Sequence, residues 1–529
     1  MRGLRAPGTV GISGAVPGSP DVDFAMAATD AVEIERKFDV KESAHLPSLQ
    51  GLPGVHRLDI PVEHRLEAEY FDTKDLRLAS GQITLRRRTG GHDAGWHLKL
   101  PSAKDGRTEF REPLGEASDG VPESLLSLVR VHTREQPVGP VAKLETRRIE
   151  HRLLDAEGTV LANVSDDQVK AETLAPKRPV RHWREWEIEL VEGSRDLLDA
   201  GQDWLAAAGV QPSAHHSKLA RAFGMDPNEP AGATLEPKPK GPAGNVMLAY
   251  LGEQVRELKA QDPLVRLDTP DAVHKMRVAT RRMRSVLATY RKLMGNPDSV
   301  NALRDELKWL AGVLGEARDA EVMHARLKDM IGEEPGRLVM GPVIRRIDLE
   351  LGADYQKAHA KVLKSLDRPR YFRLLDALES LLASPELAPL ASKRARKVIP
   401  RLVNRDIKRL RAAVREAKRH PAGTGDDLAL HEARKAGKRL RYAAEAATPI
   451  SPKKAGRLAE AAHGVQKVLG DHQDSVVTRD LLRRLGARAF KQGENGFSYG
   501  RLHALEQAIA LESEARFRRQ WKKFPSVSL

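Results

Sequence analysis

The sequence predicts a multidomain protein. An α+β domain, built on an eight-stranded antiparallel β tunnel or barrel, is followed by an all-α bundle with pseudo-twofold symmetry. Three observations predict this fold class. Short runs of period two occupy residues 31–192, apolar residues recur at intervals of three and four beyond residue 244, and this second region contains an internal repeat.

Length and composition exclude several classes of protein. At roughly 100 to 200 residues per domain, 529 residues predict two to four domains. The absence of cysteine excludes disulfide scaffolds, zinc–thiolate sites and Fe–S clusters. No run approaches the roughly 18 apolar residues of a membrane span, and the start of the chain lacks the apolar centre of a secretory signal. We therefore expect a cytoplasmic protein with no membrane span.

Local composition predicts the domain boundaries. Residues 1–29 are rich in Gly, Ala and Pro without periodicity, which predicts a disordered tail, and either Met1 or Met26 could be the biological start. Residues 30–225 form the first predicted domain. The proline-rich segment 226–244 is a predicted linker, and residues 245–522 form the helical domain.

Charge is divided unevenly between these halves. Residues 1–230 hold 30 Lys+Arg and 37 Asp+Glu, a net charge of −7, whereas the rest of the chain carries a net charge of +22. The basic half should attract a polyanion, namely nucleic acid, an anionic membrane surface or polyphosphate.

The first domain contains eight candidate strands separated by Gly, Pro and Asp turns. We expect them near residues 31–40, 64–72, 82–88, 96–100, 107–112, 142–152, 159–166 and 183–191. Two helices, near residues 194–208 and 216–224, should close this domain.

Charged and apolar residues alternate along these strands. Glu33, Glu35 and Lys37 share one face of the first strand, and two neighbouring carboxylates suit Mg²⁺, which takes oxygen ligands. The same alternation gives later strands a charged face, formed by Arg86 and Arg88; by His97 and Lys99; by Arg107, Glu109 and Arg111; and by Glu185, Glu187 and Glu189.

These charged faces favour a closed barrel over an open sheet. An open sheet would need a large core on its other face, which two short helices cannot readily cover. A barrel instead points its charged faces into the lumen and its apolar faces outwards. A lumen with cations and carboxylates fits a short chain of phosphates bridged by a divalent cation. For any one strand taken alone, a solvated sheet face is the alternative.

Several motifs resemble the CYTH superfamily, the triphosphate tunnel metalloenzymes. EIERK is similar to the ExExK signature of that family. YFDTKDLRLASGQITLRRR with WHLKLP, and the later REWEIELVEG and HHSKLARAF, are similar to its further blocks, over about residues 31–224. The resemblance implies an eight-stranded antiparallel tunnel that hydrolyses inorganic or organic triphosphates with Mg²⁺ or Mn²⁺.

The resemblance also implies roles for individual residues. Glu35 and Lys37 would be catalytic, with Lys37 orienting the attacking water or binding a phosphate. The metal ligands would be Glu33, Glu35, Glu187 and Glu189, and the phosphate-binding residues would be Lys37, Arg86, Arg88, Lys99, Arg111 and Arg147. A surface or salt-bridge role is the alternative for each basic residue. His97 is interpreted as structural, and Asp166 and Asp167 as turn residues or metal ligands.

The helical half contains two copies of a basic motif. Residues 274–284 match residues 431–441, and Leu314–Asp319 match Leu469–Asp474 further along. Each copy places a histidine and three cations on one helical stripe, His274, Arg277, Arg281 and Arg284 in the first and His431, Arg434, Lys438 and Arg441 in the second. A solvated amphipathic face is the alternative, but the repetition favours a binding surface.

These repeats resemble the CHAD domain, a conserved-histidine α-helical module associated with inorganic polyphosphate, over about residues 245–522. The resemblance implies polyphosphate binding by His274, Arg277, Arg281, Arg282, Arg284, His431, Arg434, Lys438, Arg439 and Arg441. Asp319 and Asp474 are interpreted as partners that orient arginines, with helix packing as the alternative. Nucleic acid is disfavoured, because few aromatic side chains lie among the basic stripes.

The expected function is therefore metal-dependent hydrolysis of inorganic or organic triphosphate in the tunnel, coupled to polyphosphate binding by the helical domain. The alternative is a non-catalytic protein that binds polyphosphate or is targeted to polyphosphate granules, and an adenylate cyclase of the class IV type is the third reading. The acidic set Glu33, Glu35, Glu187 and Glu189 favours the enzyme, because a pure anion binder would gain from losing these charges.

Overall fold

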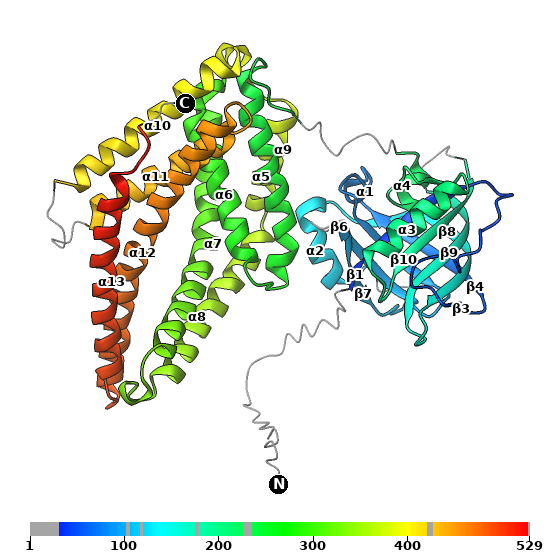
Figure 1. Ribbon diagram of the computed structural model, residues 1–529, viewed down its shortest axis with the longest axis horizontal. Coiled ribbons are helices and arrows are strands. Elements are labelled where there is room, and N and C mark those ends of the chain that lie inside the picture. Colours follow the sequence, from blue (N-terminus) through cyan, green and yellow to red (C-terminus); the bar gives the residue numbers. More distant parts are fainter. Residues whose placement is uncertain are drawn as a thin grey trace, which may run out of the picture.

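The computed structural model describes residues 31–101, 106–116, 120–174, 179–225, 235–419, 427–526 and 529. The predicted tail, residues 1–29, and the first part of the predicted linker, residues 226–234, lie outside the described residues. The described chain forms a β-rich domain and a helical domain that lie side by side (Figure 1). The predicted fold class is confirmed.

The β domain is one antiparallel sheet with eleven strands in the described residues. The strands are β1 Ala31–Glu33, β2 Glu35–Val40, β3 Arg57–Leu58, β4 Val62–Asp72, β5 Thr84–Thr89, β6 Gly95–Pro101, β7 Arg107–Glu112, β8 Gly139–Leu154, β9 Val160–Thr173, β10 Arg181–Leu190 and β11 Gln211–Pro212. Their order is β1-β7-β6-β5-β4-β8-β9-β10-β2-β11, with β3 beside β8. The first of the eight predicted strands is divided at Ile34, and β3 and β11 are short additions.

The divided first strand closes the sheet on itself. β1 pairs with β7 at one edge of the sheet, and β2 pairs with β10 at the other. Because β1 and β2 are consecutive in the chain, residues 31–40 complete the wall of a tunnel. Side chains along each strand then alternate between the lumen and the outer face.

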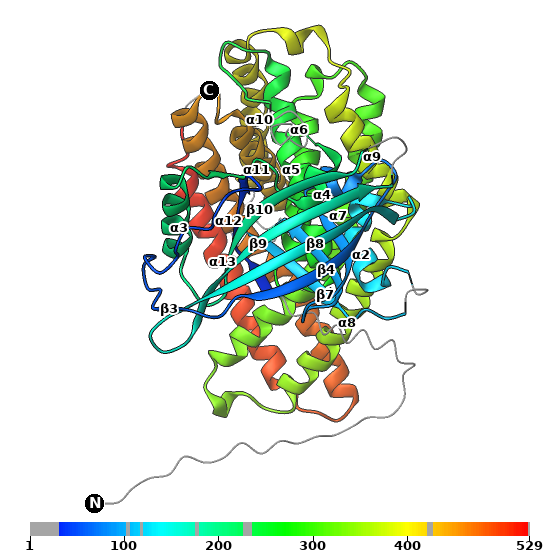
Figure 2. The same cartoon turned by 90° about the vertical axis from the view of Figure 1, so that its right-hand side faces the viewer.

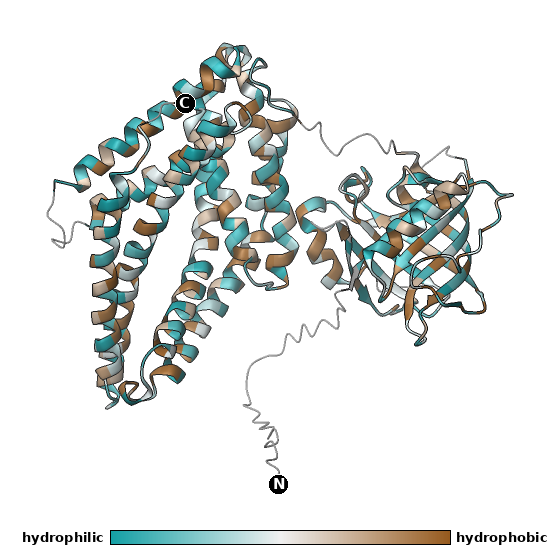
Figure 3. Cartoon of the chain, in the orientation of Figure 1, coloured by the Kyte–Doolittle hydropathy of each residue, from teal (hydrophilic) through white to brown (hydrophobic). Residues whose placement is uncertain are grey.

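The outer face is apolar and covered by helices. On β10, Trp186 and Ile188 belong to a core that includes α3 (Arg195–Ala207). On β6 and β7, Leu98 and Phe110 belong to a second core with α2 (Glu123–Thr133). Figure 3 shows the alternation as teal and brown segments along the strands.

Helix α4 (Lys218–Phe223) closes one end of the tunnel. Its Leu219 and Phe223 pack among apolar side chains that point inwards there, including Tyr70, Leu144 and Val169. The polar part of the lumen extends from this plug to the β5–β6 turn at residues 90–94.

Two helices of this domain, α1 (Arg77–Ser80) and α2, were not predicted from the sequence. α1 has only four residues, too few to show a helical period. α2 is amphipathic, with Leu125, Leu128 and Val129 buried on one face, but the surrounding period of two obscures it.

Helix α2 also joins the two domains (Figures 1 and 2). Leu125 faces the core of the β domain, whereas Val131 belongs to the core of the helical domain. After the helix, Arg134 is only 5% exposed and lies 3.3 Å from Asp376 and 2.8 Å from Glu379 of α9 (Pro369–Ala383). Apolar packing and a buried arginine thus hold the domains together.

The helical domain is built from two equivalent halves. The first contains α5 Ala243–Arg266, α6 Ala272–Thr289, α7 Pro297–Gly332 and α8 Val343–Leu366; the second contains α10 Ala395–Ala417, α11 Asp427–Ala447, α12 Pro452–Lys491 and α13 Phe497–Trp521. The repeated basic motifs lie on α6 and α11, which contact each other and bury apolar faces that include Met283 and Leu440. None of the helices in the described part of the chain has the length and apolar character needed to cross a bilayer.

Candidate functional site

The tunnel lumen contains a polar cavity of about 270 Å³. It is lined by nine of the residues to which the family resemblance gave a catalytic, metal-binding or phosphate-binding role, namely Glu33, Glu35, Lys37, Arg86, Arg88, Lys99, Arg111, Glu187 and Glu189. They meet there because the inward positions of six different strands converge on one lumen.

Three carboxylates crowd one part of the wall. Glu189 on β10 is the direct cross-strand partner of Glu35 on β2, and Glu33 lies two residues before Glu35. Burial raises the pKa of Glu189 to about 7, and repulsion from Glu33 and Glu35 adds to the shift. Like charges placed opposite each other destabilise a sheet unless a proton or a cation neutralises them. A proton or a cation at Glu35 and Glu189 would therefore relieve this repulsion.

Lys37 lies beside this carboxylate site. Its Nζ is 3.1 Å from the Glu35 carboxylate and also donates to Glu187. Burial lowers the pKa of Lys37, but attraction to Glu187 and Glu35 outweighs burial and raises it overall. The ammonium therefore stays protonated, and Lys37 can donate to a phosphate oxygen or to a water but cannot act as a base.

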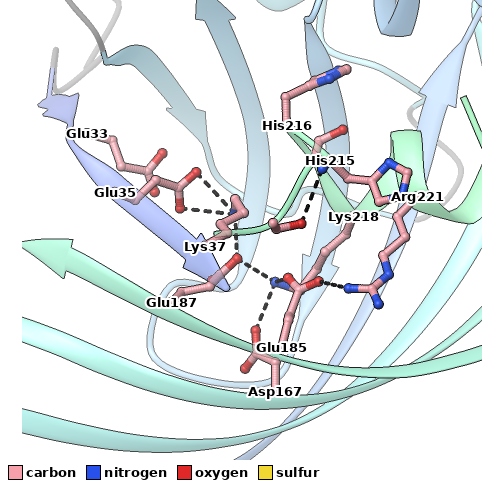
Figure 4. Close-up of polar contacts among 12 residues, drawn as sticks. Glu33, Glu35, Lys37, Asp167, Glu185, Glu187, His215, His216, Lys218 and Arg221 are labelled. Carbon is pink, nitrogen blue, oxygen red and sulfur yellow. Dashed lines mark hydrogen bonds and ion pairs between the residues drawn. The ribbon is translucent and has the colours of Figure 1, made fainter. Parts of the chain in front are cut away.

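A second carboxylate cluster already holds cations. Asp167, Glu185 and Glu187 have ligand oxygens within 4.8 Å of one another, which a metal could use. The ammonium of Lys218 lies among them, 2.9 Å from Asp167 and 2.7 Å from both glutamates (Figure 4). Arg148 donates to Asp167 and Glu187, at 2.7 Å in each case.

These cations decide the charge of Glu187. Burial alone would raise its pKa, but Lys218, Lys37 and Arg148 together hold it well below the usual range. Side-chain cations therefore satisfy the carboxylates of Asp167, Glu185 and Glu187.

Basic side chains with unused donors line the β5 and β6 side of the lumen. The Nε atoms of Arg86 and Arg88 are buried and have no hydrogen-bond partner among the described residues. Burial lowers the pKa of Arg88 to about 9, and repulsion from Arg86 and Arg148 adds to this. Lys99 Nζ lies 2.5 Å from the Glu33 carboxylate. Cations that repel one another in a buried lumen favour a polyanionic ligand.

Arg147, expected to bind phosphate, lies outside the tunnel. It is on the outer face of β8, is 45% exposed and pairs with Glu63 at 2.7 Å. Thr146, Arg148 and Glu150 occupy the inward positions of this strand. The expectation is therefore corrected from Arg147 to Arg148, because a shift of one residue moves a side chain to the other face of a strand.

Five further lumen residues have no catalytic, metal-binding or phosphate-binding role predicted from the sequence, although Arg107 and Glu109 were expected on a charged strand face. They are Arg107, Glu109, Arg148, Arg152 and Lys218. The sequence does indicate that Arg148 faces inwards. Lys143 and Glu145 lie four and two residues before Arg147, on the same face of β8, and these charged side chains mark that face as the outer one. No strand period could have found Lys218, which enters the lumen from the first turn of α4.

Three residues remain to be placed: Asp166 and Asp167, expected as turn residues or metal ligands, and His97, expected to be structural. Asp167 points into the lumen, whereas Asp166 pairs with Arg184 at 2.6 Å. His97 is buried, with Nδ1 2.9 Å from Glu109 and Nε2 2.8 Å from the carbonyl oxygen of Asp93. Burial lowers the pKa of His97 to about 4, against the hydrogen bond to Glu109, which raises it. The contact with the His97 ring fixes the position of the Glu109 carboxylate.

The helical domain carries a separate cationic site. The stripes of α6 and α11 bring together Arg277, Arg281, Arg434 and Lys438. Burial lowers the pKa of Lys438 to about 6, and repulsion from Arg281, Arg434 and Arg277 adds to the shift. Four cations this close favour a bound polyanion. We call these four residues the cation cluster.

The second repeated motif positions the arginines of the cation cluster. Arg277 Nη1 donates to Asp319 at 2.8 Å, and Arg434 Nη2 lies 3.8 Å from Asp474. In the same motif, a Cβ at Gly315 would lie 3.2 Å from the Arg277 guanidinium, and a Cβ at Gly470 would lie 3.6 Å from that of Arg434. The aspartates orient the arginines as expected, and the two glycines leave room for them.

Three other arginines named from the repeats have protein partners of their own. Arg439 pairs with the buried Asp406 at 2.8 Å, and Arg441 pairs with Glu445 at 2.7 Å. Arg282 lies over the ring of Tyr442, 5.7 Å from its centroid. These contacts give the three arginines structural roles beside any contact with a ligand.

The two histidines and Arg284 lie at the ends of the stripes. His431 Nδ1 is 2.6 Å from Gln473 Oε1. Burial lowers the pKa of His274, and repulsion from Arg318 adds to this. Arg284 stands near Arg304, whose pKa is lowered by burial and then by Arg284.

Comparison with known proteins identifies both halves of the chain. The uncharacterized protein Rv2226 of Mycobacterium tuberculosis is 42% identical over 496 residues, which cover 90% of this chain and 93% of that protein. The CYTH domain family matches residues 31–223, and the CHAD domain family matches residues 249–483. This chain is a CYTH–CHAD protein. CYTH domains are metal-dependent and act on triphosphates, and the membership of this family that the sequence motifs predicted is confirmed.

Solved structures are similar to parts of this CYTH–CHAD protein. The CHAD domain from the plant Ricinus communis is 24% identical, with a TM-score of 0.44, and the match covers 55% of this chain and 94% of that one. PptA from Streptomyces chartreusis is 21% identical, with a TM-score of 0.43, and the match covers 53% of this chain and 99% of that one.

Proposed function

We propose that the tunnel hydrolyses inorganic triphosphate, or an organic triphosphate, with a divalent cation, and that the helical domain binds inorganic polyphosphate. One observation carries the first part. Glu35 and Glu189 face each other in a lumen that is lined by both carboxylates and Arg or Lys side chains. Buried carboxylates would weaken a site that only held phosphate, whereas a metal–phosphate complex needs both charges.

Glu33, Glu35 and Glu189 would hold Mg²⁺ or Mn²⁺ through carboxylate oxygens. The bound cation would neutralise negative charge on phosphate oxygens. Glu187, also expected to be a ligand, accepts from Lys37, Lys218 and Arg148. We therefore assign Glu187 the task of positioning these cations.

The phosphates would bind to the lumen cations. Arg86 and Arg88 offer unpaired donors, and Arg148 and Lys99 lie on neighbouring inward positions. Lys37, held protonated between two glutamates, would donate to a phosphate oxygen or orient the water. These fixed positive charges would stabilise the charge on the transferred phosphoryl group while water attacks in line, so no covalent nucleophile is required.

Phosphate release tests this assignment. We would measure release from tripolyphosphate, ATP and long-chain polyphosphate with Mg²⁺ or Mn²⁺, for the wild type and for Glu33→Gln/Glu35→Gln. Glu63→Gln, on the outer face of β4, is the matched control. We expect release by the wild type and the control and loss in the double variant.

The other outcomes separate the alternatives. Absence of release by the wild type, with triphosphate still bound, would leave a non-catalytic tunnel that only holds its ligand. Cyclic AMP and pyrophosphate formed from ATP would indicate the cyclase instead.

Polyphosphate binding rests on the cation cluster. We expect salt-sensitive retention of long-chain polyphosphate, because each phosphate contact releases a counterion. Retention should be lost when Arg277, Arg281 and Arg434 are replaced by alanine. Equal retention of polyphosphate by the wild type and this triple variant would contradict the assignment of the cation cluster as the binding site. Association with polyphosphate granules stays a prediction.

A further inference from the structure

Two histidines and a glutamate, which together could ligate a metal ion, also lie in the tunnel lumen. One ligand atom from each of His64, His92 and Glu150 falls within 4.8 Å of the others. All three side chains line the cavity, at the end away from the α4 plug. We propose that His64, His92 and Glu150 form a transition-metal site for Zn²⁺ or a similar borderline ion at the open mouth of the tunnel. We call these three residues the mouth site.

The fold builds the mouth site from three segments. His64 and Glu150 occupy inward positions on the neighbouring strands β4 and β8, where His64 is paired in register with Arg148, two residues before Glu150. His92 comes from the β5–β6 turn. This turn folds tightly onto β4: Gly90 has φ +78°, and a Cβ there would lie 2.1 Å from the carbonyl oxygen of Arg65. This close approach of the turn to β4 brings the His92 ring into contact with the His64 ring.

The two rings meet without a hydrogen bond between them. Their centroids are 4.7 Å apart, and the ring planes are nearly perpendicular, at 86°. His64 Nε2 is buried and has no hydrogen-bond partner among the described residues. An imidazole with an unpaired buried nitrogen is suited to ligate a metal.

The ligand types favour a different ion from the one proposed deeper in the lumen. Mg²⁺ prefers oxygen ligands, whereas two imidazoles and one carboxylate are typical of Zn²⁺ and related ions. Glu150 Oε1 accepts a hydrogen bond from Arg152 Nε at 3.2 Å, which leaves the second carboxylate oxygen for an ion. A fourth coordination position would face the lumen, open to water or to a phosphate oxygen.

Equilibrium dialysis of the full chain tests the mouth site. The metal-free protein is dialysed against Zn²⁺ in excess Mg²⁺, which keeps the carboxylate site occupied by the harder ion. Co²⁺ in place of Zn²⁺ provides a second readout, since nitrogen ligation in a four-coordinate site gives visible absorption. We expect one ion per chain in the wild type, and binding at least about 100-fold weaker in His64→Ala/His92→Ala.

The controls separate this site from its neighbours. His151→Ala removes a histidine next to Glu150 on the other face of β8, and Glu33→Gln/Glu35→Gln removes the carboxylate site; both should keep the ion. His92→Ala alone changes only the exposed turn, so its weaker binding would not reflect misfolding. Equal binding by the wild type and the histidine variants, or loss of the ion in Glu33→Gln/Glu35→Gln, would overturn the proposal.

Discussion

Glu35 on β2 and Glu189 on β10 lie directly opposite each other, and the next inward pair on the same two strands is Lys37 with Glu187. The wall of the tunnel therefore changes from a like-charged pair to an ion pair within two residues. Lys37 neutralises Glu187, whereas burial, and then repulsion from Glu33 and Glu35, raises the pKa of Glu189. An external divalent cation would complete the balance.

Arg147 and Arg148 offer a test of which face of β8 binds phosphate. Arg148→Ala should lower kcat/KM for tripolyphosphate by about 100-fold, because it removes a buried charge from the lumen. Arg147→Ala should change it less than about threefold, since an exposed ion pair contributes little. Steady-state phosphate release measures both. A larger loss in Arg147→Ala than in Arg148→Ala would contradict the assignment of the faces.

Gly315 on α7 should separate helix stability from ligand binding. Alanine in a helix is more stable than glycine by about 1 kcal/mol, but the new Cβ would press on the Arg277 guanidinium. We expect Gly315→Ala to weaken polyphosphate binding about tenfold, or 1.4 kcal/mol, without lowering Tm.

Gly312→Ala is the matched control on the same helix, because its Cβ would meet nothing within 4 Å. It should keep full affinity and raise Tm slightly. Calorimetry with long-chain polyphosphate, together with thermal unfolding, provides both readouts. Equal affinities for the two glycine variants would show that Gly315 has no role in positioning Arg277.

Lys438 predicts a pH dependence of polyphosphate binding. Its pKa is lowered to about 6, so at pH 7.5 the free protein holds this amine largely uncharged. A bound polyanion favours the ammonium and raises the pKa, so binding takes up a proton, and affinity increases as the pH falls from 8 to 6.

Titration calorimetry in two buffers of different ionisation enthalpy measures this proton uptake. Lys438→Arg, which stays charged throughout, should abolish the contribution of this site and leave only the titration of the polyphosphate itself. Identical buffer dependence in the wild type and Lys438→Arg would contradict the prediction.

Arg134 should couple the unfolding of the two domains. Its side chain is buried at the end of α2 and forms ion pairs with Asp376 and Glu379 of the helical domain. Arg134→Ala should lower the free energy of unfolding by about 1–3 kcal/mol and separate the thermal transitions of the domains. Arg57→Ala, which removes an exposed arginine of β3, is the control. Unchanged calorimetric traces for both variants would mean that apolar packing alone couples the domains.

The sequence predicted the lumen best where alternation alone decides the face. Glu33, Glu35, Lys37 and Glu187 follow from a period of two, because inward and outward positions are a local property of a strand. Alternation did not identify the inward arginine of β8, because Arg147 and Arg148 are adjacent and have the same charge. Only Lys143 and Glu145, earlier on the strand, indicate that the odd-numbered positions face outwards.

Long-range contacts could not be predicted from local patterns. Lys218 reaches Asp167 and Glu187 only because α4 folds into the end of the tunnel. Arg439 belongs to a repeated basic motif, yet it pairs with Asp406 on α10, a contact set by helix packing. The repeats did predict that Arg277 and Arg434 are equivalent residues, and they come close together because the two repeated helices, α6 and α11, contact each other.

The most direct measurement of the central claim is the position of Mn²⁺ in crystals of the full chain grown with tripolyphosphate. Anomalous scattering locates the ion without reference to activity. We expect an ion bound by Glu33, Glu35 and Glu189, with phosphate oxygens completing its coordination and Arg86, Arg88 or Arg148 on the same phosphates. Tripolyphosphate bound in the lumen with no ion at these three carboxylates would contradict the account.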